Sequence, residues 1–101
     1  MVKVNRLPEC REIKMQKRNY SELTKTFQTN FKTLVDFYGI SFQQISYDQD
    51  IETIYVEKIY KGEYETLSPF IILCFSSYFG TEFYEITHHR VVTIKGELYY
   101  L

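Results

Sequence analysis

Two adjacent histidines and the arginine after them, His88, His89 and Arg90, are the residue types in this chain best suited to chemistry on a phosphate group. An imidazole can move a proton and a guanidinium can bind phosphate oxygens, as in small toxin-type ribonucleases. The surrounding residues predict a strand, in which His88 and Arg90 share one face and His89 points to the other. A ribonuclease is therefore one alternative, and a strand end that runs past the edge of the core is the other.

No other residues have the spacing of a catalytic or metal site. Two histidines on opposite faces of a strand cannot grip one metal ion, and no pair of His or Cys elsewhere has ligand spacing. The four glycines are isolated turn markers and form no phosphate-binding loop. The sequence therefore predicts no cofactor, no metal and no catalytic residue, and a protein that is not an enzyme.

Glutamates and tyrosines alternate through residues 52–85 and suggest a surface for a protein partner. Carboxylates can supply the charge pattern of phosphates, so such a surface could occupy the basic groove of a nucleic-acid enzyme. The predicted surface consists of Tyr55, Glu57, Tyr64, Glu82, Tyr84 and Glu85. The alternative is an ordinary charged outer face of a sheet.

A stripe of basic residues near the N-terminus is the third candidate. Most of its members are seven residues apart, which places them on one face of a continuous helix. The stripe consists of Arg11, Lys14, Arg18, Lys25 and Lys32. It could contact phosphates directly, although an isoelectric point near 6.1 disfavours a dedicated nucleic-acid-binding protein. A solvated helix face is the alternative.

The elements that must position these residues begin with an amphipathic helix over residues 20–38. Apolar residues recur there at steps of three and four, Ser21 can cap the start, and Gly39 can close the end. Residues 10–18 are rich in helix formers and are expected to be helical, either as a separate helix or as the first part of a longer one.

The remainder, residues 41–101, reads as strands separated by turns, because β-branched and aromatic residues are abundant and Pro69 fits a strand start. We expect one α+β domain over residues 1–101, with the helical part at about 9–38 and a four- to five-stranded antiparallel meander at about 41–101. An N-terminal helix, or two, would pack on this sheet. The order of elements resembles cystatin-like domains and several small inhibitor and toxin folds, a likeness of architecture that implies no function.

Composition ranks the functional hypotheses. The 101 residues have a net charge of −1, yet residues 1–32 carry +5 and residues 33–101 carry −6. Ten tyrosines and eight phenylalanines, with A/T-rich codons, indicate a low-GC genome. We expect a cytoplasmic, non-catalytic protein-binding module with no membrane span, and a small phage or mobile-element inhibitor of a host nucleic-acid enzyme or defence complex as its role. Direct nucleic-acid binding is the alternative, and a homodimer is left open.

Overall fold

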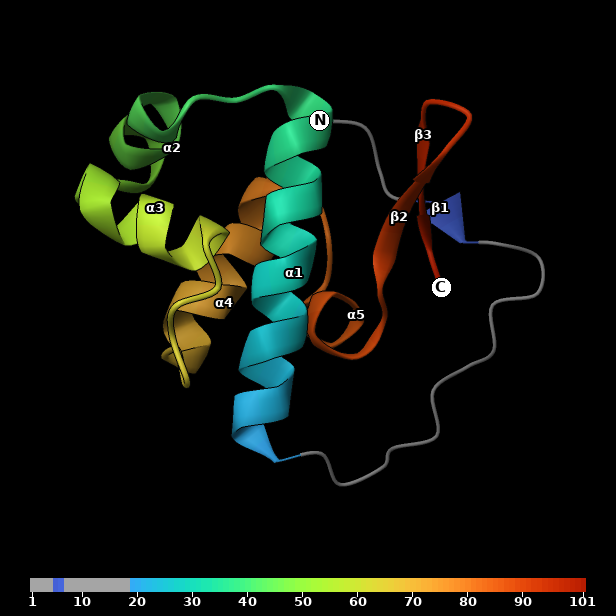
Figure 1. Ribbon diagram of the computed structural model, residues 1–101, viewed down its shortest axis with the longest axis horizontal. Helices are drawn as coiled ribbons and strands as arrows, with labels where there is room; N and C mark the ends of the chain where they lie inside the picture. Colours follow the sequence, from blue (N-terminus) through green and yellow to red (C-terminus); the bar gives the residue numbers. More distant parts are fainter. Residues whose placement is uncertain (1–4, 7–18) are drawn as a thin grey trace.

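Helices dominate the computed structural model, which describes residues 5–6 and 19–101 (Figure 1). The elements in these residues are β1 (Asn5–Arg6), α1 (Tyr20–Tyr38), α2 (Phe42–Gln49), α3 (Thr53–Tyr60), α4 (Pro69–Tyr78), α5 (Phe83–His88), β2 (Val91–Ile94) and β3 (Glu97–Tyr100). The predicted four- to five-stranded meander is wrong, because residues 42–88 form four helices. The likeness to cystatin-like domains is lost with it.

Helix α1 is the central element and has the bounds that the apolar spacing predicted. Phe27, Phe31 and Leu34 on its apolar face are fully buried. The prediction that Ser21 caps the helix is wrong. Asn19 caps it instead, by accepting a hydrogen bond from the backbone N–H of Glu22 at 3.0 Å. Gly39 closes the helix as predicted, with a φ of 64° that glycine adopts without strain.

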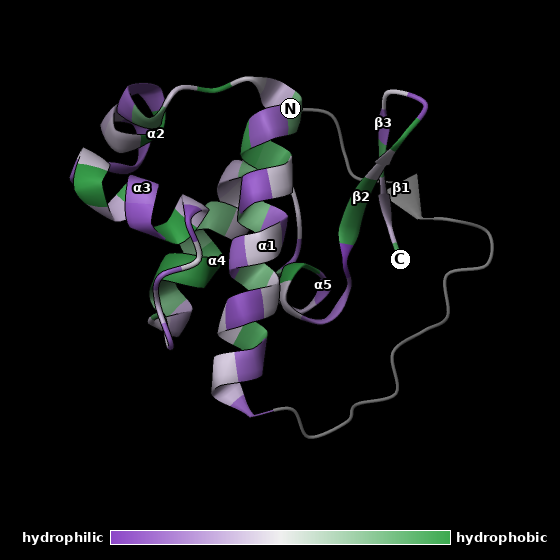
Figure 2. Cartoon of the chain, viewed as in Figure 1, coloured by the Kyte–Doolittle hydropathy of each residue, from purple (hydrophilic) through white to green (hydrophobic). Residues whose placement is uncertain are grey.

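Helix α4 shows why the strand prediction failed. Its residues are apolar and partly β-branched, but Ser68 accepts a hydrogen bond from the N–H of Phe70 and Pro69 occupies the first helical turn. That pair is a helix-start signal, since proline has no N–H to lose there. In Figure 2 most of α4 is hydrophobic, whereas α1 alternates between hydrophobic and hydrophilic positions. Composition alone therefore could not separate a buried helix from a strand.

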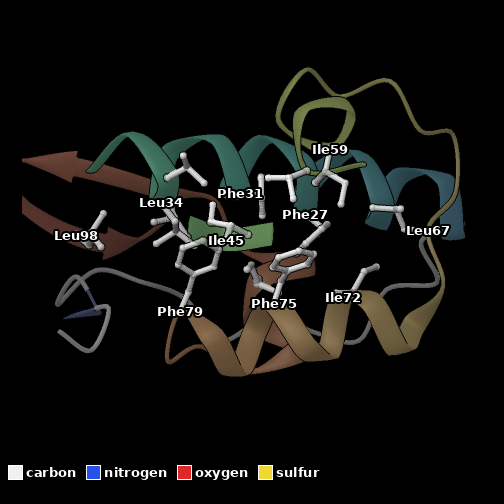
Figure 3. Close-up of a cluster of buried hydrophobic side chains, with 14 of the residues drawn as sticks. Phe27, Phe31, Leu34, Ile45, Ile59, Leu67, Ile72, Phe75, Phe79 and Leu98 are labelled. Atoms are coloured by element: carbon white, nitrogen blue, oxygen red, sulfur yellow. The ribbon is translucent and has the colours of Figure 1, made fainter. Parts of the chain in front are cut away.

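The core lies between α1 and α4 (Figure 3). Phe31 packs edge to face against Phe75 and Phe79, with ring centroids 5.0 and 5.7 Å apart. Ile45 of α2 and Ile59 of α3 complete the cluster from its other sides. These aromatic contacts bind the helices into one packed unit.

Two tyrosine hydroxyls join helices at the surface. Tyr60 of α3 donates to Asp36 of α1 at 2.6 Å, and Tyr78 of α4 donates to Asp48 of α2 at 2.6 Å. Some of the many tyrosines therefore fasten one helix to another.

The small sheet holds both ends of the described chain together. β2 and β3 form an antiparallel hairpin whose turn, Lys95 and Gly96, has positive φ at both positions. This is the conformation of a two-residue hairpin turn, and the turn at Gly96 was predicted. β1 pairs with β3 in parallel, so the order is β1-β3-β2 in the residues that the structure describes.

The predicted helix at 10–18 and its junction with α1 lie outside the described residues. Within the described ranges, no helix is long and apolar enough to cross a membrane.

Candidate functional site

An apolar hollow with a volume of about 490 Å³ lies between α3 and α4. Its apolar lining comes from four side chains, Ile51, Ile59, Leu67 and Ile71. Tyrosines 55 and 64 and the carboxylates of Asp50 and Glu52 complete the lining, which contains no basic residue. An apolar hollow with a few convergent polar groups is the usual form of a binding site.

The two helices beside this hollow also carry exposed apolar side chains. Tyr55 is 49% exposed, and the same two helices expose Ile54 at 49%, Phe70 at 69% and Leu73 at 51%. Figure 2 shows the hydrophobic colouring of both helices.

Helix α1 fixes the connection that forms one wall of the hollow. The buried Gln28 side chain donates to the carbonyl of Tyr64 at 2.8 Å and accepts from its N–H at 3.1 Å. Thr24 accepts from the N–H of Leu67 at 3.3 Å, and the Tyr20 hydroxyl donates to the Leu67 carbonyl. The backbone of this irregular segment is therefore paired at both Tyr64 and Leu67.

Burial raises the pKa of Tyr64, with smaller contributions from Tyr55 and Glu63. The phenol therefore stays protonated beyond its ordinary range and can donate a hydrogen bond to a partner.

The six residues of the predicted acidic and tyrosine surface are divided by the fold. Tyr55 and Tyr64 line the hollow together. Glu57 does not line it and accepts a hydrogen bond from Lys61 at 2.8 Å. The other three residues lie at α5, on the opposite side of α1 from α3 (Figure 1); they are Glu82, Tyr84 and Glu85.

A second hollow, of about 310 Å³, brings together residues from two different predictions. Lys25 of the basic stripe and His88 and Arg90 of the phosphate candidate line it, with Thr26, Thr29 and Asn30. It lies between α1 and the junction of α5 with β2, across α1 from the apolar hollow.

His88 and Arg90 line the same hollow, but strand alternation is not the reason, because the strand begins only at Val91. His88 instead ends α5, and the buried His89 donates from Nδ1 to the Leu101 carbonyl at 2.7 Å. Only one imidazole therefore lines the hollow.

The other basic residues lie beside this hollow or outside the described chain. Lys32 and Lys61 line an adjoining hollow of about 300 Å³ that shares Lys25 and Thr29. Arg11, Lys14 and Arg18 lie outside the described residues.

Several site residues were missed by sequence reasoning. Residues 41–101 were read as strands and turns, so Asp50 was not proposed and Glu52 was left out of the six residues of the predicted surface. The steps of four from Ile51 to Tyr55 to Ile59 could have placed these three on one helical face of the hollow. No comparable signal exists for Gln28, which looks like an ordinary polar residue in a helix.

In the described part of the chain, no three His, Cys, Asp or Glu side chains come together as a metal site would require. Comparison with protein-family models, curated proteins and solved structures finds no match to this chain.

Proposed function

We propose that this chain is a non-catalytic protein-binding module whose partner inserts apolar side chains into the hollow between α3 and α4. The observation that carries the proposal is the lining: an apolar floor, two tyrosines, two carboxylates and no basic group. Tyrosine offers a large contact area with a hydrogen-bonding hydroxyl and is enriched at interfaces.

Charge complementarity indicates the chemistry of the partner. Asp50 and Glu52 line the hollow, and Glu63 and Glu65 are exposed on the connection that follows α3. A partner segment that presents lysine or arginine beside apolar residues would satisfy both the charge and the floor.

The biological role proposed is inhibition of a host nucleic-acid enzyme or defence complex by a phage or mobile-element protein in the cytoplasm. Enzymes that bind nucleic acid carry basic grooves, which an acidic, tyrosine-rich surface can occupy. The support for this role is the acidic balance of residues 33–101 together with the abundance of amino acids whose codons are rich in A and T.

The test compares two double variants in affinity capture from a nuclease-treated lysate of a low-GC Gram-positive bacterium, followed by binding assays with the purified partner. Tyr55→Ala with Glu52→Lys alters the hollow. Tyr84→Ala with Glu82→Lys makes the same changes on α5. Because buried interface tyrosines often dominate affinity, the first variant should bind at least about tenfold more weakly and the second normally.

Loss of binding in the α5 variant alone would transfer the site to α5 and refute the role of the hollow. A parallel capture is made from untreated lysate. A partner captured there but not from the nuclease-treated lysate would refute direct protein binding.

A further inference from the structure

The basic hollow between α1 and the α5–β2 junction has the lining of an anion site. Lys25, His88 and Arg90 contribute cationic or proton-donating groups, and no carboxylate lines it. Thr26 and Thr29 add hydroxyls from the α1 side. The volume of about 310 Å³ lies at the small end of ligand sites.

The cationic side chains of this hollow differ from those of the adjoining basic surface in their pairing with acidic groups. Lys61 is held by Glu57 at 2.8 Å, and Lys32 lies 3.9 Å from Asp36 and over the ring of Tyr60. By contrast, the side chains of Lys25 and Arg90 make no ion pair or hydrogen bond with other described residues. Two exposed cations beside one hollow repel each other unless an anion lies between them.

The backbone that carries His88 and Arg90 is fixed by hydrogen bonds to α1. The buried Asn30 donates from Nδ2 to the carbonyls of Ile86 and His89, both at 2.7 Å, and accepts at Oδ1 from the N–H of Val91 at 2.9 Å. These three bonds bracket His88 and Arg90. The junction is therefore held in one conformation before any ligand binds, which reduces the entropy cost of binding.

The ring of His88 is oriented as well. Its Nδ1 lies 2.9 Å from the hydroxyl oxygen of Thr87 and 3.0 Å from the carbonyl oxygen of Tyr84. Both contacts are made at Nδ1, so Nε2 is the ring nitrogen left for a ligand.

We propose that this hollow binds a phosphate group through Lys25, His88 and Arg90. The donors come from two elements on different sides of the hollow, which suits a tetrahedral anion better than a planar carboxylate. The guanidinium supplies a two-pronged contact and the ammonium a point charge. The phosphate belongs either to a free anion or nucleotide or to a nucleic-acid backbone. The site is independent of the hollow between α3 and α4, because the two share no lining residue.

The test is a titration of the full chain followed by backbone amide NMR shifts, with sodium phosphate, a 5′-mononucleotide and a short single-stranded oligonucleotide in separate arms at constant ionic strength. Saturable shifts should appear at residues 25–30 and 86–91. Tighter binding of the oligonucleotide with a steep dependence on salt would identify a nucleic-acid backbone as the source. Equal binding by all three would identify the single phosphate.

The double variant Lys25→Gln with Arg90→Gln should bind at least about tenfold more weakly, because two charge-assisted contacts are lost. Lys58→Gln with Lys95→Gln is the matched control, since it removes the same charge at exposed residues outside the hollow, and it should bind normally. Shifts that sodium chloride reproduces, or equal weakening in both double variants, would overturn the proposal. Because the lining residues differ, this failure would leave the protein-binding proposal intact.

Discussion

The hollow between α3 and α4 has an apolar, acidic lining, whereas the hollow beside the α5–β2 junction has a polar, basic one. In both, a side-chain carboxamide of α1 holds the backbone that lines the hollow. Gln28 holds the backbone of Tyr64 on one side, and Asn30 holds the backbone on either side of His88 and Arg90 on the other. Residues that are two positions apart in a helix, such as Gln28 and Asn30, are separated by about 200° around its axis. Their carboxamides therefore point to opposite sides of α1. One helix thus positions an acidic apolar site and a basic polar one independently.

The largest expected effect comes from removing what the two hollows share. Phe31→Ala leaves a cavity between α1 and α4, where Phe31 contacts Phe75 and Phe79. We expect a loss of about 4 kcal/mol in the free energy of unfolding, measured by urea denaturation. Both partner and phosphate binding should decline together as the fraction folded falls. A loss below about 1 kcal/mol would show that the core is not the common support.

Asn30→Ala should separate the two hollows. Three buried backbone groups lose their partner, so we expect a loss of about 3 kcal/mol. Amide hydrogen exchange should accelerate at residues 86–91 and remain slow at Tyr64. Phosphate binding should weaken in the molecules that stay folded. Equal acceleration on both sides of α1 would contradict independent positioning.

Gln28→Ala is the reverse experiment and should cost about 2 kcal/mol, because it removes two bonds to the backbone of Tyr64 and a longer one, of 3.4 Å, to the Thr24 carbonyl. Exchange at Tyr64 should accelerate, partner binding should weaken, and phosphate binding should be unchanged. Thr33→Ala is a suitable control on the same helix, since among the described residues the Thr33 hydroxyl bonds only to the Thr29 carbonyl one turn earlier. If the control weakens the partner equally, the effect belongs to helix α1 as a whole.

The smallest effect is confined to the side of the molecule that carries the apolar hollow, where Tyr78 joins α4 to α2. Burial, and then the hydrogen bond to Asp48, raise the pKa of Tyr78 to about 12 from an ordinary value of 10.0. The folded state therefore retains this proton more strongly than the unfolded chain. Its contribution to stability is complete below pH 10 and is lost as the pH rises towards 12.

Tyr78→Phe should make the urea midpoint less dependent on pH in this interval. Tyr47→Phe, at a tyrosine that is 84% exposed, should leave that dependence unchanged. An identical pH dependence in the wild type and Tyr78→Phe would exclude Tyr78 as its source.

Secondary structure was predicted correctly from the sequence where several local signals agreed. It was predicted wrongly where amino-acid composition was the single signal used. The apolar period and Gly39 defined α1, and Gly96 marked the hairpin turn. Residues 51–60 and 70–79 were read from β-branched and aromatic composition, which is a weak prior that tertiary packing overrides. The helix start at Ser68 and Pro69 was the signal to prefer.

The sequence indicated individual residues of the candidate sites, but not which of them come together in the fold. Lys25, His88 and Arg90 were each singled out, yet their meeting depends on how α5 packs against α1, which no local pattern encodes. The acidic surface was predicted on one sheet and is instead divided between α3 and α5. Buried polar side chains such as Gln28 were missed because their partners are backbone groups far along the chain.

The reach of Asn30 has a consequence for the order of folding. Its three partners lie 56, 59 and 61 residues further along the chain. During synthesis, α1 therefore emerges from the ribosome long before the groups that its carboxamide binds, and until then water must satisfy that side chain. Contacts this distant in sequence form slowly compared with helical turns. We expect the helices to pack together first. The hollow between α1 and the α5–β2 junction should form last, when the hairpin of β2 and β3 docks.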